Sequence, residues 1–202
     1  MIKLVIFDFD GTIVDSKAIY YNSFKKNITN LSVKQIDELV NKGGQLEHFL
    51  NELGFSKLKK WLVKRKIMKD VFKNLDNVRK CRDADAIGKV KTEKILISNS
   101  TLDFIIPIVN RLKLMKYFSE IYGGDNFSDK QDFISDYLKK NKLKKDEVMY
   151  VGDRIADIKL ARNLGIIGAV VSGKCAWNSR KELIEAEPDF IVEDIVDINQ
   201  IL

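Results

Sequence analysis

Acidic side chains cluster at two points in the sequence, each directly after a short apolar run. Asp8 and Asp10 follow the first run, and Asp153 and Asp157 follow a later one. Residues two apart on an extended chain point the same way, so the first pair converges at one strand end. Carboxylates held this close repel each other unless a cation or a shared proton offsets the repulsion. Because Mg²⁺ binds a few oxygen ligands and commonly bridges a phosphate, these four residues predict a magnesium site.

Polar residues after two further apolar runs predict a pocket for a phosphate group. Ser98 and Asn99 precede a helical pattern, so their hydroxyl and amide groups would meet at a helix N-terminus, where anions bind readily. Lys130 follows the next run, and its ammonium group would neutralise a phosphoryl oxygen. Taken singly, these residues are explained as well by helix capping and by surface charge. Their occurrence beside two acidic pairs favours the phosphate pocket.

These residues must be positioned by the elements that precede and follow them. Apolar runs predict strands at residues 2–7, 95–97, 121–122, 148–151, 166–171 and 190–192. Helix-period segments lie between them, at residues 102–114, 130–140, 155–164 and 180–186. This alternation indicates an α/β fold, a Rossmann-like parallel sheet with helices on both faces. Ligands bind at the carboxyl ends of such strands, which is where the acidic pairs fall.

Residues 15–90 interrupt the alternation and carry only helical patterns. Apolar residues that include Leu58, Leu62, Met68 and Phe72 predict one long helix that packs through these positions. We therefore expect an all-helical cap, residues 15–90, inserted after the first strand. The α/β core would then consist of residues 1–14 and 91–202.

The insert carries most of the positive charge. The net charge is +6, and residues 15–90 hold 17 lysines and arginines against nine acidic residues. A solvated helix face explains this surplus as well as an anionic partner does. The densest basic run consists of Lys57, Lys59, Lys60, Lys64, Arg65, Lys66 and Lys69. It keeps open a phosphatase of polynucleotide ends, although we expect nucleic-acid binding to be weak and sensitive to salt.

The cysteine content and the length of the apolar runs predict the cellular compartment of the protein. Cys81 and Cys175 lie far apart in the sequence, so we expect neither a disulfide framework nor a zinc site, and a reducing compartment. No apolar run approaches the roughly 18 residues that a membrane helix needs. The first apolar run stops at Asp8, too early for a secretory signal. A cytoplasmic protein without membrane contact is therefore expected, and its oligomeric state is left open.

With the acidic pairs and the polar residues at these four strand ends, the chain resembles the haloacid dehalogenase-like hydrolases, in the phosphatase branch with a helical cap after the first strand. Residues 8–16 resemble the first motif of that family, residues 95–99 its second and residues 152–157 its fourth. Lys130 stands where the third-motif lysine is expected, but Gln131 follows it where proline is usual. The stretch 173–190 resembles the phosphoglycolate phosphatase-like subgroup.

The resemblance implies a two-step phosphoryl transfer to water from a small phosphorylated metabolite. Asp8 would attack phosphorus and form an aspartyl-phosphate, and Asp10 would act as acid and then as base. Mg²⁺ would be held by Asp8, Asp10 and Asp153, with Asp157 in support. The phosphoryl oxygens would be bound by Thr12, Ser98, Asn99 and Lys130.

Three alternatives to a small-molecule phosphatase stay open. A phosphomutase of the β-phosphoglucomutase type uses the same core, but it usually has a histidine where this chain has Tyr20. The other two are the polynucleotide-end phosphatase and a non-catalytic phosphate-binding relative. Substrate choice would lie in the cap, where the turn formed by Lys42, Gly43, Gly44 and Gln45 is the candidate substrate loop.

Overall fold

The computed structural model describes residues 1–29, 31–42, 46–82 and 84–202. Its centre is a six-stranded sheet in the order β5-β4-β1-β6-β7-β8, in which every neighbouring pair is parallel. The strands are β1 (Leu4–Phe7), β4 (Glu93–Ile97), β5 (Glu120–Tyr122), β6 (Val148–Gly152), β7 (Ile167–Val171) and β8 (Phe190–Val192). The predicted parallel α/β sheet is confirmed.

Strand β1 is the centre of the sheet and is buried on both faces. Val5 and Phe7 point into one apolar cluster with Phe104 of α5 (Leu102–Arg111). Leu4 and Ile6 point into the other cluster, with Ile134 of α6 (Lys130–Lys140) and with residues of α7 (Ile155–Leu164). Because alternate residues of a strand face opposite sides, this four-residue apolar run fills both layers at once.

The order of the strands places an opening beside the end of β1. The chain runs from β1 outward through β4 and β5, and then returns to β6 on the other side of β1. The connections on the two sides of β1 therefore diverge, and a crevice forms at the carboxyl ends of β1, β4 and β6. All the predicted site residues outside the helical insert follow the ends of strands in this sheet.

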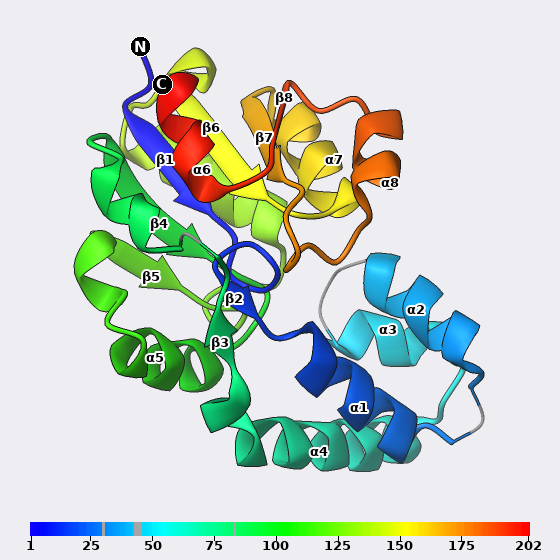
Figure 1. Ribbon diagram of the computed structural model, residues 1–202. Helices are drawn as coiled ribbons and strands as arrows, with labels where there is room; N and C mark the ends of the chain where they lie inside the picture. The colour runs from blue at the N-terminus through cyan, green and yellow to red at the C-terminus, as the bar shows by residue number, and fades with distance from the viewer. Residues whose placement is uncertain (30, 43–45, 83) are drawn as a thin grey trace.

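A helical insert, residues 16–78, lies at the same end of the sheet. It holds α1 (Lys17–Asn27), α2 (Val33–Lys42), α3 (Leu46–Glu52), α4 (Lys57–Lys73) and the 3₁₀ turn η1 (Leu75–Asn77). Figure 1 shows these helices grouped together, at the end of the molecule opposite the two termini. The chain enters and leaves the insert through an antiparallel pair of short strands, β2 (Val14–Asp15) and β3 (Arg79–Lys80), which the sequence did not predict.

After β3 the chain rejoins the sheet. The 3₁₀ segment η2 (Ala84–Lys89) places Ile87 in the same apolar cluster as Ile198 of η5 (Ile195–Gln200). The described residues of 81–90 thus pack with the sheet, and the division of the chain at residue 90 stays a prediction. The other elements are η3 (Met115–Tyr117), η4 (Lys145–Glu147) and α8 (Arg180–Glu185).

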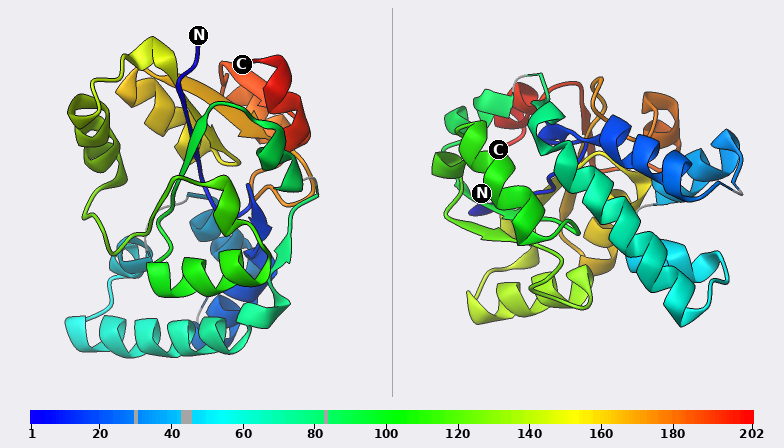
Figure 2. Two further views of the ribbon diagram at one scale, coloured as in Figure 1. Left: turned by 90° about the vertical axis from the view of Figure 1, so that its left-hand side faces the viewer. Right: turned by 90° about the horizontal axis from the view of Figure 1, so that it is seen from below.

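Helix α4 packs through only part of the predicted apolar stripe, which also included Val71. Its buried residues are Ile67 and Val71, and Ser23 of α1 donates from Oγ to the Ile67 carbonyl at 3.0 Å. Leu58, Leu62 and Phe72, expected to pack, are 68%, 43% and 37% exposed. Figure 2 shows α4 along the outer edge of the molecule, so only one of its sides packs against the other helices of the insert. Apolar residues occur on both sides of the helix, and the periodicity alone did not identify the buried one.

The two cysteines are bonded to each other, so the expectation that they do not pair is wrong. Cys81 follows β3 and Cys175 follows β7, and their Cα atoms lie 5.7 Å apart across a sequence separation of 94 residues. Sequence distance hid the pairing because the fold returns both segments to the loop after β1. Among the described residues, no helix has the length and hydropathy that would cross a membrane.

The two sides of α4 give a direct test of its packing. Ile67→Ala removes a fully buried side chain and should cost about 2–5 kcal/mol of unfolding free energy. Leu58→Ala removes an exposed one and should change it by about 0.5 kcal/mol or less. Urea unfolding of both variants measures the difference. Equal costs would mean that α4 packs through the face that the sequence suggested.

Candidate active site

Asp8 and Asp10 lie in a tight loop between β1 and β2. The Asp8 N–H donates to the Val151 carbonyl at 2.8 Å, which continues the β1–β6 pairing by one residue. Gly11 then takes φ +82°, a left-handed conformation that side chains disfavour. A Cβ atom on Gly11 would lie 2.2 Å from Oδ2 of Asp153, so the loop packs directly against the second acidic pair. Glycine is needed here both for the turn and for this close approach.

Three of the predicted metal ligands converge. Asp8, Asp153 and Asp157 are buried, and each offers one carboxylate oxygen within 4.8 Å of the other two. Asp157 lies in the first turn of α7 and accepts from the backbone N–H groups of Asp153 and Arg154 at 3.1 and 3.0 Å. These bonds fold the end of β6 back over the start of α7. They bring together carboxylates that are four residues apart.

The burial of these acids makes their negative charge costly. Burial raises the pKa of Asp153 well above its ordinary value, and the neighbouring carboxylates of Asp157 and Asp8 raise it further. The pKa of Asp157 is raised by burial and by the charge of Asp8. A divalent cation between the three carboxylates would offset this repulsion. The donor set consists of carboxylate oxygens only, and it fits Mg²⁺.

Asp10 has surroundings of its own. It accepts from Ser16 Oγ and, at 2.6 Å, from Ser100 Oγ. Ser100 Oγ is also hydrogen-bonded to the hydroxyl of Tyr20 in α1, at 3.0 Å. Ser100 therefore connects a helix of the insert to the side chain of Asp10. Burial is the main cause that raises the pKa of Asp10, and the two serine hydroxyls oppose the rise. The burial of Asp10 therefore favours the protonated form of its carboxyl group more than solvent would.

The predicted phosphate-binding residues lie around the same point. Lys130, the first residue of α6, is buried, and its Nζ lies 2.7 Å from Asp8 Oδ1. Ser98 is buried after β4, and its Oγ accepts from the N–H of Ser100 at 3.1 Å. Asn99 is half-buried between these two serines. Thr12 donates to Asp153 Oδ1 at 3.2 Å, so in this structure its hydroxyl contacts the acidic cluster.

The candidate substrate loop lies largely outside the described residues. Gly43, Gly44 and Gln45 are not described, and of Lys42 only its place at the end of α2 is. The residues that the structure adds to the site are instead Ser16, Ser100, Tyr20, Arg154 and Trp177. Hydroxyl groups beside an acid could have suggested the two serines. Nothing local in the sequence indicates that Trp177 reaches the site, and the one signal for Tyr20 is its position, where phosphomutases of the β-phosphoglucomutase type usually have a histidine.

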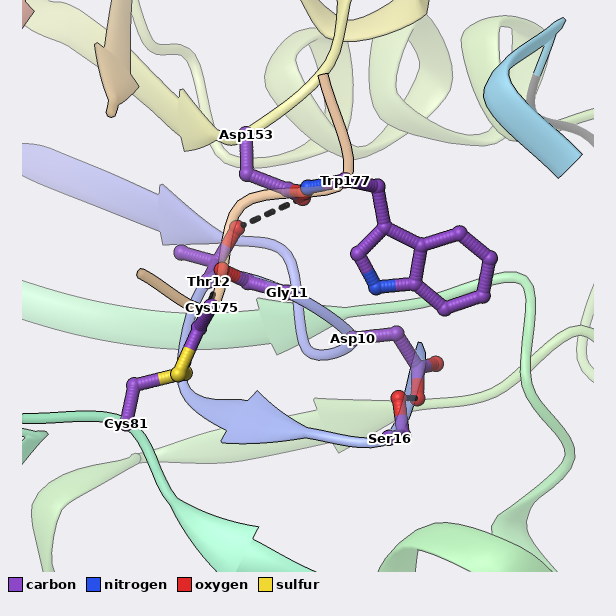
Figure 3. The surroundings of a disulfide bond; sticks show 8 residues. All are labelled: Asp10, Gly11, Thr12, Ser16, Cys81, Asp153, Cys175 and Trp177. Carbon is purple, nitrogen blue, oxygen red and sulfur yellow. Dashed lines mark hydrogen bonds between the residues drawn. A yellow bond between two sulfur atoms is a disulfide. The ribbon is translucent and has the colours of Figure 1, made fainter. Parts of the chain in front are cut away.

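Trp177 connects several parts of the site. Its backbone N–H donates to Asp153 Oδ2 at 2.6 Å, and Figure 3 shows the backbone of Trp177 beside the Asp153 carboxylate. The guanidinium carbon of Arg154 lies 3.7 Å from the centroid of the Trp177 ring. The centroids of the Trp177 and Tyr20 rings are 6.0 Å apart. The indole N–H of Trp177 is buried and has no hydrogen-bond acceptor among the residues that the structure describes. A cation and an unused donor thus lie together between the acidic cluster and α1.

Comparison with known proteins agrees with this geometry. The chain is 24% identical to a phosphoglycolate phosphatase of Synechococcus elongatus over 207 aligned positions, which cover 98% of this chain and 96% of that protein. A haloacid dehalogenase-like family hydrolase from Streptococcus pneumoniae superposes with a TM-score of 0.83 at 20% identity, covering 99% of this chain and 98% of that one.

A second solved structure gives the same result. A protein from Haemophilus somnus, described as a predicted phosphoglycolate phosphatase, has a TM-score of 0.79 at 22% identity, with 99% and 97% of the two chains covered. A sequence model described as haloacid dehalogenase-like hydrolase matches residues 5–171. This chain is therefore a member of the haloacid dehalogenase-like hydrolases.

Proposed function

We propose that this hydrolase is a Mg²⁺-dependent phosphatase that acts on a small phosphomonoester through an aspartyl-phosphate. One observation carries the proposal. Asp8 lies between a lysine and two further acids, while a second, separately hydrogen-bonded acid, Asp10, stands two residues away. The loop after β1 thus carries both a nucleophile, Asp8, and a proton donor, Asp10. Lys130 and the site for a cation lie beside Asp8. The phosphoglycolate phosphatases among the similar proteins support the same reaction class.

The nucleophile is the carboxylate of Asp8. It attacks phosphorus in line with the leaving oxygen, and one P–O bond forms as the other breaks. Lys130, already within hydrogen-bond distance of Asp8, neutralises an oxygen of the transferring group. The carboxylates of Asp8, Asp153 and Asp157 would hold Mg²⁺, with the Asp10 backbone carbonyl implied as a further ligand by the family resemblance, and the ion would supply positive charge that offsets the negative charge of the phosphoryl group.

Asp10 moves the proton in both steps. Its raised pKa favours the protonated carboxyl group, which gives its proton to the departing oxygen. As a carboxylate it then takes a proton from the water that attacks the aspartyl-phosphate. Ser16 and Ser100 fix both oxygens of Asp10 by hydrogen bonds, so the group keeps one orientation in the two steps.

We also infer that the preferred substrate carries a second anionic group on its leaving side. The Arg154 guanidinium lies on the Trp177 ring, and its charge acts on Asp10, the residue that faces the leaving group. The unused indole N–H of Trp177 adds a donor at the same place. A carboxylate accepts from both kinds of donor. A small phosphoester with a carboxylate, such as 2-phosphoglycolate, has this chemistry.

The first test removes the two acids of the loop one at a time. Asp8→Asn should abolish phosphate release from p-nitrophenyl phosphate, and Asp10→Asn should lower kcat by about 10²-fold or more because it removes the proton transfer. Chelation with EDTA should stop the wild-type enzyme, and added Mg²⁺ should restore it. Asp132→Asn, an exposed acid of α6, is the control and should keep full activity. Turnover by Asp8→Asn at a tenth of the wild-type rate would contradict covalent catalysis.

The second test compares two substrates of similar size. Arg154→Gln should lower kcat/KM for 2-phosphoglycolate about tenfold more than for ethyl phosphate, a difference of about 1.4 kcal/mol. Only the first substrate has a carboxylate for the guanidinium group to bind. Steady-state kinetics with both esters measure the ratio. An equal loss for both would mean that Arg154 acts on the catalytic acids and not on the substrate.

A further inference from the structure

The Cys81–Cys175 bond joins the base of the helical insert to the core. Cys81 follows directly after β3, where the chain returns from the insert, and its N–H donates to the Ile13 carbonyl at 2.9 Å. Its sulfur lies 3.9 Å from the carbonyl oxygen of Gly11. Figure 3 shows the bond beside Gly11 and Thr12, on the loop that carries the catalytic acids.

The other end of the bond lies in the loop that supports Asp153. Cys175 is two residues before Trp177, whose N–H holds the Asp153 carboxylate. The carbonyl of Trp177 accepts from Nζ of Lys17, the first residue of α1, at 2.8 Å. Loop 172–178 therefore contacts both connections between the insert and the sheet, Lys17 at the start and Cys81 at the return.

The other contacts of the return connection are non-covalent: the fully buried Val78 packs in the main apolar cluster, and the rest are hydrogen bonds. Arg111 of α5 donates to the carbonyls of Leu75 and Val78 at 2.9 and 2.7 Å, and β3 pairs with β2 over two residues. Hydrogen bonds of this kind can break and re-form as the insert moves. The disulfide is the one covalent link of the described residues that joins this connection to the loop beside Asp153.

We propose that Cys81 and Cys175 are a reversible thiol–disulfide site that controls the movement of the helical insert. A disulfide and its two thiols interconvert by exchange with small disulfides and dithiols, so the state of such a pair follows the redox potential of its surroundings. The oxidant is a low-molecular-weight disulfide and the reductant a dithiol. The effect of the bond on activity rests on the phosphatase function proposed above. The formation of the bond and its effect on the insert do not.

The exchange proceeds in two balanced steps. Cys175, the more exposed of the two, loses its proton to solvent, and its thiolate attacks one sulfur of the small disulfide and releases one small thiolate. The Cys81 thiol then loses its proton, and its thiolate attacks the Cys175 sulfur and displaces the second small thiolate. Two protein thiols are oxidised, and one small disulfide is reduced to two thiols.

The oxidised state restrains the insert over the site. Tyr20 and Lys17 of α1 already contact Ser100 and Trp177 in this structure, which is a closed arrangement. A substrate reaches Asp8 and phosphate leaves only when such contacts open, and opening of this kind commonly limits turnover. A covalent link at the base of the insert slows that opening. Oxidation therefore lowers kcat, and reduction restores it.

The experiment compares the protein after treatment with oxidised glutathione and after treatment with dithiothreitol. Alkylation and mass spectrometry should find no free thiol in the first sample and both thiols free in the second, since the chain has two cysteines. Hydrogen exchange of residues 78–82 and 172–178 should be slower after oxidation. The kcat for p-nitrophenyl phosphate should be at least about fivefold lower in the oxidised sample.

The double variant Cys81→Ser/Cys175→Ser is the matched control, because a single variant keeps one thiol that can form a mixed disulfide with glutathione. It should keep the exchange and the kcat of the reduced protein in either buffer. Thiols that stay free in oxidised glutathione, or a bond that dithiothreitol does not break in the folded protein, would overturn the proposal. Equal exchange in the two samples, or an oxidised enzyme that turns over as fast as the reduced one, would overturn it too. If neither sample releases phosphate, the phosphatase function fails, and thiol counts and hydrogen exchange alone decide the redox proposal.

Discussion

Electrostatic repulsion among buried carboxylates is the constraint on which this structure depends. Asp8, Asp10, Asp153 and Asp157 are all buried, and the first, third and fourth lie within a few ångströms of one another. Burying like charges together costs free energy unless opposite charge or hydrogen bonds compensate. Lys130 binds Asp8, two backbone N–H groups and a tyrosine hydroxyl bind Asp157, and Thr12 and Trp177 bind Asp153. Much of the polar structure at the end of the sheet consists of these compensating contacts.

The same contacts explain how distant segments meet at the site. Asp153 needs the Trp177 N–H, so loop 172–178 lies against the loop after β1. Asp10 needs Ser16 and Ser100, and Ser100 in turn contacts Tyr20 of the insert. The sheet, the insert and loop 172–178 thus all contact the same group of acidic residues. The Cys81–Cys175 bond adds a covalent link where hydrogen bonds already converge.

The parts of the structure that depend on local sequence were predictable. The sheet and its helices follow from the alternation of apolar runs, and the convergence of Asp8 and Asp153 follows from their places at strand ends. Features that depend on tertiary packing were not predictable in this way. Leu58 and Ile67 are both apolar residues of α4, and only the position of α1 decides which of them is buried. The pairing of the cysteines and the stacking of Arg154 on Trp177 likewise join segments that no local pattern relates.

The central claim is that the Asp8 carboxylate becomes phosphorylated during turnover, and isolation of the intermediate tests it most directly. The enzyme would be mixed with Mg²⁺ and a phosphoester, quenched in acid within the first turnover, and digested for mass spectrometry. The account predicts one phosphoryl group on the peptide that contains Asp8, fragment ions that assign it to that residue, and its removal by hydroxylamine, which cleaves acyl phosphates. Phosphate release at full rate with no modified peptide at any quench time, or a phosphoryl group on a residue other than Asp8, would contradict the account.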